Sequence, residues 1–109
     1  MANTSELLRG HTDTILLAQL SREDGYGYQL GKAISKATGG ALELKEATLY
    51  SAFRRLEETG AITSYWGEES AGARRRYYSI TDAGREALAE GREQWRNVRA
   101  MLDELLGKE

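Results

Sequence analysis

Residues 46–81 read EATLYSAFRRLEETGAITSYWGEESAGARRRYYSIT, and this stretch decides the fold predicted for the whole chain. Its first part has the period of an α-helix. The apolar face of that helix is formed by Leu49, Ala52, Phe53 and Leu56. Gly60 is placed to end the helix, because glycine tolerates the left-handed conformation that is common just past a helix C-terminus.

Two strands are predicted after this helix. The first covers residues 61–66, and the loop GEESAG at 67–72 leads to a second strand that begins on three arginines, Arg74, Arg75 and Arg76. Helix, hairpin and basic strand follow in the order in which a winged helix-turn-helix presents its recognition helix and its wing to DNA. The predicted fold class is therefore mainly α with a small β-hairpin.

The residues before this stretch predict two more helices. Residues 6–20 carry apolar side chains on more than one side, which indicates a helix with a second packing partner. Gly25, Tyr26 and Gly27 are expected to form a turn, with a helix over residues 28–38 behind it. Residues 42–44 predict at most a very short strand. Residues 1–80 would then form the winged helix-turn-helix domain.

The remaining residues, 81–109, predict one long helix that serves dimerisation. Thr81 is a suitable N-cap, and the Asp82 carboxylate is favourable in the first turn. Small and apolar residues follow a 3-4-3-4-3 spacing, the a/d seam of a coiled coil, at Leu88, Gly91, Trp95, Val98, Leu102 and Leu105. A domain this small offers little surface to cover that seam. The pattern therefore predicts a homodimer, and the excess apolar surface of the first helix would be part of the same interface.

Composition excludes several other classes of protein. The chain has no cysteine, which rules out disulfides, thiolate zinc sites and a cysteine nucleophile. Its single histidine, His11, has no ligand set around it, and there is no catalytic constellation, phosphate loop or metal cluster. We expect no enzyme activity and no cofactor. No apolar stretch is long enough to span a bilayer, so a cytoplasmic location is expected. The net charge of −2 leaves a local basic patch possible.

The segments TLYSAFRRLEETGAI and RRRYYSITDAG resemble the PadR family of transcriptional regulators, whose pattern is A-T-L-Y-x-x-[FL]-x-R-L-E-x-x-G. Length, SYWGEES and EQWRNVRAML are similar to the small PadR-like multidrug-sensing repressors within it. The resemblance extends over nearly the whole chain. It implies a dimeric DNA-binding repressor that responds to small molecules.

The resemblance assigns DNA contacts to the recognition helix and the wing. The groove-facing side chains would be Ala47, Thr48, Tyr50, Ser51 and Arg54. Arg54 is the residue best able to form bidentate hydrogen bonds with a guanine edge or a phosphate. Arg74, Arg75 and Arg76 would contact phosphates from the wing, although charge on an edge strand also protects against aggregation. Tyr28 and Lys32 are further phosphate candidates.

Trp95 is the candidate effector residue. Periodicity alone favours a packed aromatic at an a position of the seam. In the multidrug-sensing PadR-like proteins, however, the matching tryptophan stacks on flat aromatic drugs between the protomers. The resemblance carries that role to Trp95, with further lining from Leu7, Gly10, Asp13, Thr14 and Val98.

The charge of such an effector stays open. Arg99 stands where the best-known member of that group has an acidic residue, so cationic drugs would be opposed unless Asp13 compensates. Two alternatives to a drug-sensing repressor also stay open. One is a DNA-binding regulator without a small-molecule site, and the other is a dimeric winged-helix module that binds protein.

Overall fold

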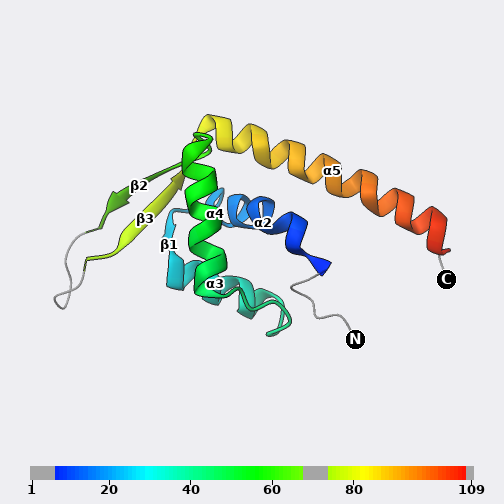
Figure 1. Cartoon of the computed structure of the whole chain (residues 1–109), viewed down its shortest axis with the longest axis horizontal. Coiled ribbons are helices and arrows are strands. Elements are labelled where there is room, and N and C mark those ends of the chain that lie inside the picture. The colour runs from blue at the N-terminus through cyan, green and yellow to red at the C-terminus, as the bar shows by residue number, and fades with distance from the viewer. Residues whose placement is uncertain (1–6, 68–73, 108–109) are drawn as a thin grey trace.

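The computed structural model describes residues 7–67 and 74–107 (Figure 1). In chain order the elements are η1 (Arg9–His11), α2 (Thr12–Leu20), β1 (Gly25–Tyr26), α3 (Gly27–Ala37), α4 (Glu46–Glu58), β2 (Ile62–Trp66), β3 (Arg76–Ile80) and α5 (Asp82–Leu106). The chain is mainly helical with one small antiparallel sheet, which confirms the predicted fold class.

The first predicted helix differs from the structure at its beginning. Where residues 6–20 suggested one α-helix, the described part consists of the 3-10 turn η1 followed by α2, which begins at Thr12. The cause is a tighter hydrogen-bond pattern, in which the backbone N–H of His11 donates to the carbonyl of Leu8 at 2.8 Å. Within α2, Leu16, Leu17 and Leu20 are buried, as its broad apolar surface indicated.

The sheet has three strands in the order β1-β3-β2, one more than the predicted hairpin. The expected turn at residues 25–27 is corrected, because Gly25 pairs with Tyr78 and Tyr26 with Tyr77, and α3 begins at Gly27. β3 begins at Arg76 rather than at Arg74. Residues 42–44 form no strand, although Leu42 is buried in the core. Most of the predicted loop at 67–72 lies outside the described residues.

Helix α4 has the buried face that its sequence predicted, and it ends before Gly60 as expected. Leu49, Ala52, Phe53 and Leu56 are all buried. The chain leaves the helix through Gly60, whose φ of 79° is the left-handed conformation expected at such an end. The Phe53 ring stacks on Tyr78 of β3, with ring centroids 4.0 Å apart. This contact fixes the recognition helix against the wing.

One core joins all of these elements. Its buried apolar residues are Leu16, Leu17, Leu20, Leu30, Ile34, Leu42, Leu49, Ala52, Phe53, Leu56, Ala61, Ile62, Tyr78 and Leu88. The list contains residues from α2, α3, α4, the sheet and α5. The inner face of α4 is therefore part of the same core as α2, α3 and the sheet.

Helix α5 begins as predicted and then divides into two parts. Thr81 caps it, since its Oγ1 accepts a hydrogen bond from the Gly84 N–H at 3.0 Å. Leu88 is 3% exposed, and Gly91 is buried against Thr14 of α2. The prediction that the whole row from Leu88 serves pairing is therefore corrected for its first two positions, which the same chain covers. Figure 1 shows the C-terminal part extending past α2.

Candidate nucleic-acid interface

The outward face of α4 carries small and polar side chains. Ala47, Thr48, Ser51, Arg54 and Arg55 are all exposed, opposite the four residues that bury the inner face. The helical period places them there, because side chains three and four apart share a face. The structure therefore brings four of the five predicted groove-facing residues onto one accessible surface.

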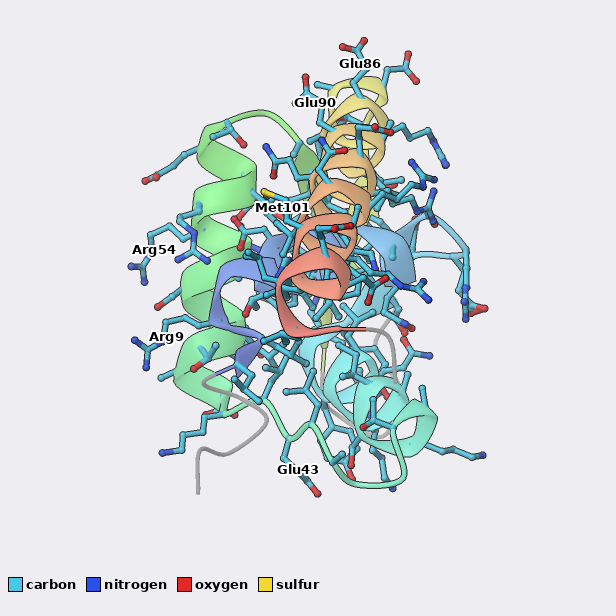
Figure 2. All side chains as sticks on the ribbon, turned by 90° about the vertical axis from the view of Figure 1, so that its right-hand side faces the viewer. Arg9, Glu43, Arg54, Glu86, Glu90 and Met101 are labelled. Atoms are coloured by element: carbon cyan, nitrogen blue, oxygen red, sulfur yellow. The ribbon has the colours of Figure 1, made fainter. Side chains whose placement is uncertain are left out.

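Arg54 and its neighbour Arg55 differ in their surroundings. Arg54 projects outward from α4 (Figure 2), and it forms no ion pair with any other residue of ranges 7–67 and 74–107. Arg55 instead pairs with Asp13 of α2, its Nη2 lying 2.7 Å from Oδ1. That hydrogen bond, together with the negative charge, raises the pKa of Arg55 above its ordinary value. The charge of Arg55 is thus compensated, while the Arg54 guanidinium is available to a partner.

Tyr50 lies at the edge of this surface rather than in its middle. Its ring meets Phe53 edge-on with centroids 5.7 Å apart, and its hydroxyl lies against Gly27 at the start of α3. The exposed side chains of Tyr28 and Lys32 follow on α3, with the Lys32 Nζ 5.6 Å from the Tyr28 ring centroid. A hollow of about 450 Å³ between α3 and α4 is lined by these three residues and by Glu43 and Glu46.

The three arginines of the wing occupy three different environments. The Arg74 guanidinium lies 5.3 Å from the Trp66 ring centroid, and that of Arg75 lies 4.9 Å from the Tyr26 centroid. Both side chains are exposed and lie over aromatic rings of the sheet.

Arg76 is held inside the domain's own hydrogen-bond network. Its Nη2 donates to Ser64 Oγ at 2.8 Å and lies 3.3 Å from Glu57 Oε2, and Ser64 Oγ donates to the same carboxylate oxygen at 2.8 Å. Glu57 belongs to α4 and Ser64 to β2. Arg76 therefore joins the recognition helix to the wing, a role that spacing along the chain did not indicate.

An apolar groove runs between α2 and α5, on the other side of α2 from its ion pair with α4. It has a volume of about 260 Å³ and is lined by Leu8, His11, Thr14, Ile15, Ala18, Leu88, Arg92 and Trp95. Trp95 is 45% exposed and meets the His11 ring edge-on, with centroids 5.7 Å apart.

Only two of the predicted effector residues, Thr14 and Trp95, line this groove. Leu7, Gly10, Val98 and Arg99 do not line it, and the Asp13 carboxylate is directed to Arg55. Sequence analysis missed His11 and Arg92. Arg92 could have been found, because it lies three positions before Trp95 and therefore on the same helical face.

The described part of the chain has neither a metal-binding cluster nor a membrane-spanning helix. In these residues, no group of three or more His, Cys, Asp or Glu side chains is arranged to hold a metal ion. No helix within residues 7–67 and 74–107 has the length and hydropathy needed to cross a membrane.

The helix pair α3–α4, with an exposed arginine on the second helix and a basic hairpin beside it, defines a winged helix-turn-helix DNA-binding regulator. Residues 16–90 match the family described as the Transcriptional regulator PadR-like family. The chain belongs to this family, as its motifs predicted. Its members are DNA-binding regulators and not enzymes.

The chain is also similar to a solved structure and to other known proteins, two of which are named transcriptional regulators. A transcriptional regulator from Clostridium thermocellum superposes with a TM-score of 0.86 at 42% identity, covering 92% of this chain and 97% of that one. An uncharacterised protein of Lysinibacillus sphaericus is 40% identical over 91% of each chain. The Escherichia coli transcriptional regulator YqjI is 34% identical over 78% of this chain but only 39% of its own length.

Proposed function

We propose that this protein is a homodimeric repressor that binds a two-fold symmetric operator near its own promoter or an adjacent transporter operon. The observation that carries the proposal is the outward face of α4. A helix that reads the major groove needs a protruding polar face and a rigid support. Thr48, Ser51 and Arg54 supply that face, and Phe53 fastens its opposite side to the core.

The exposed part of α5 supports the dimer. Large apolar side chains are at least 43% exposed at Trp95, Met101, Leu102, Leu105 and Leu106. A run of this kind usually marks an interaction surface, because burying it against a partner removes apolar area from water. The same surface of a second copy is the simplest cover, and two-fold symmetry then positions two recognition helices on one duplex.

A gel shift tests the DNA-binding proposal. Duplex DNA from upstream of the gene is compared with a scrambled duplex of the same composition, at several salt concentrations. We expect the upstream duplex to bind more tightly, with an affinity that falls as salt rises. Arg54→Ala should weaken operator binding about tenfold to a hundredfold, because a bidentate arginine–guanine contact contributes about 1–3 kcal/mol.

Arg96→Ala is the matched control for Arg54→Ala. It removes the same charge from an exposed site on α5, where Arg96 contacts only Glu93 among the ion pairs of the described residues. We expect its affinity to equal that of the wild type. Equal affinity of the wild type for both duplexes would contradict the repressor and favour the protein-binding module.

The groove at Trp95 supports a planar aromatic effector bound next to the dimer seam. Its surface is mostly apolar, and Trp95 retains enough exposed ring to stack against a second aromatic system. Arg92 is the charged side chain in its lining, and Asp13 is paired elsewhere. An anionic aromatic acid is therefore the favoured class. Two conformations of the dimer would differ in the spacing of their recognition helices. Such an effector releases DNA if it binds the conformation that does not fit DNA more tightly than the one that does.

Quenching of tryptophan fluorescence tests this part. The probes are a phenolic acid, a neutral flavin-like compound and a planar cationic dye. We expect saturable quenching, strongest with the phenolic acid, which disappears in Trp95→Ala because only Trp66 remains as a reporter. Arg92→Ala should reduce the preference for the acid while leaving stacking in place.

The opposite outcomes are equally clear. Quenching that persists in Trp95→Ala would place the ligand at Trp66, in the wing. No saturable quenching by any probe would identify Trp95 as a packing residue and leave a DNA-binding regulator without a small-molecule site.

A further inference from the structure

We infer that the hollow between η1 and α4 binds a phosphate of the DNA backbone, and that Arg9 is its principal ligand. This inference rests on the proposed DNA binding, and it adds a segment that lies outside the helix pair α3–α4. The hollow has a volume of about 290 Å³ and is lined by Arg9, Thr12, Ala47, Thr48, Ser51 and Arg55.

The position of Arg9 is the first step of the argument. Arg9 is exposed, and in Figure 2 its side chain projects on the same side of the molecule as that of Arg54. Because Arg9 lines one hollow with Ala47, Thr48 and Ser51, it borders the groove-facing surface of α4 directly. A duplex that approaches Arg54 would therefore bring its backbone close to Arg9.

The chemistry of the lining suits a phosphate. A guanidinium offers several N–H donors in a planar fork, and the hydroxyls of Thr48 and Ser51 are additional donors. Ala47 adds no bulk that would keep a phosphate away from the helix.

The charge balance of the hollow is also favourable. Asp13 is the one acidic residue of α2, and its carboxylate lies 2.7 Å from the Arg55 guanidinium, which compensates it. No ion pair within residues 7–67 and 74–107 involves Arg9, so among these residues its positive charge beside the hollow is uncompensated. Figure 2 shows the labelled acids Glu43, Glu86 and Glu90 at other parts of the molecule.

A phosphate contact has a different experimental signature from a base contact. It contributes affinity and salt dependence but carries no sequence information. Arg9→Ala should therefore weaken binding to the upstream and the scrambled duplex by the same factor, about tenfold, and preserve their ratio. Arg54→Ala, in contrast, should reduce that ratio.

The test measures fluorescence anisotropy of both labelled duplexes between about 50 and 200 mM NaCl. For Arg9→Ala, the slope of log affinity against log salt should become shallower by about one per protomer. Arg96→Ala is the charge-matched control and should change neither the affinity nor the slope.

Asp13→Asn is expected to change DNA affinity in the opposite direction to Arg9→Ala, and this increase could not result from poor folding of the variant. The substitution keeps the shape and a hydrogen-bond acceptor for Arg55 but removes the negative charge beside the hollow. Binding to both duplexes should strengthen by a few-fold and the salt slope should steepen. A variant that folds poorly cannot bind more tightly.

The results separate the two proposals. If the wild type fails to prefer the upstream duplex, sequence-specific DNA binding is wrong. If the wild type shows that preference but Arg9→Ala has the affinity and salt slope of Arg96→Ala, the phosphate site at η1 is wrong and the proposed function stands.

Discussion

Replacing Phe53 by alanine is expected to lower the free energy of unfolding by about 3–5 kcal/mol, the usual cost of removing a buried phenyl ring. Phe53 is 1% exposed, and it stacks on Tyr78 while Tyr50 meets it edge-on. A domain of this size is stabilised by only about 5–15 kcal/mol in total. The substitution should therefore remove a large share of the stability, and it would leave the variant largely unfolded if the wild type lies at the lower end of that range.

Urea denaturation followed by circular dichroism measures this effect, at one fixed protein concentration because dimerisation contributes to stability. Phe53→Leu keeps most of the volume and should cost about 1–2 kcal/mol. Tyr28→Ala removes an aromatic ring that is 69% exposed, and should cost about 1 kcal/mol or less. A cost for Phe53→Ala no larger than that for Tyr28→Ala would show that the stack does not hold the recognition helix.

The second large effect is expected for Gly84→Ala in the first turn of α5. A methyl group there would press against the backbone carbonyl of Ala61 and lie 2.7 Å from Ile80 Cγ1. The Ala61 carbonyl cannot rotate away as a side chain could, because it also accepts the N–H of Thr81 at 3.0 Å. We expect a loss of about 3 kcal/mol, at the upper end of the range for overpacking.

Gly10→Ala provides the matched control for this substitution. A Cβ at Gly10 would meet no atom within 4 Å, so we expect a neutral or slightly stabilising effect of up to about 1 kcal/mol. Melting temperatures of the two variants and the wild type compare the effects directly. If Gly84→Ala melts at the temperature of Gly10→Ala, the close approach of α5 to Ala61 and to Ile80 of β3 is not a structural requirement.

Local patterns in the sequence were sufficient for most of the fold. The buried face of α4 and its end at Gly60 follow from the helical period and from the conformational freedom of glycine. The Thr81 cap was equally readable, because capping needs only residues three apart. The strand at Gly25–Tyr26 was not readable, since a two-residue strand has no period and exists only through its pairing with β3.

The candidate interface was predictable to a smaller extent. Sequence placed Arg54 on an outward face, and the structure leaves it there. It could not distinguish Arg54 from Arg55, because the difference is made by Asp13, which lies on another helix. For the same reason it treated the three wing arginines alike, although Arg76 is bound to Glu57 and Ser64.

The sequence by itself determined the family of the protein, the order of its α-helices and of the two hairpin strands, and the inner and outer faces of α4. These features depend on residues close together in the chain, where spacing alone specifies geometry. Only the tertiary structure decided which charges are compensated, that Leu88 and Gly91 are covered by the same chain, and that η1 borders the recognition helix. Each of these depends on how segments distant in sequence pack against one another. The spacing of residues along the chain does not specify which distant segments meet in space.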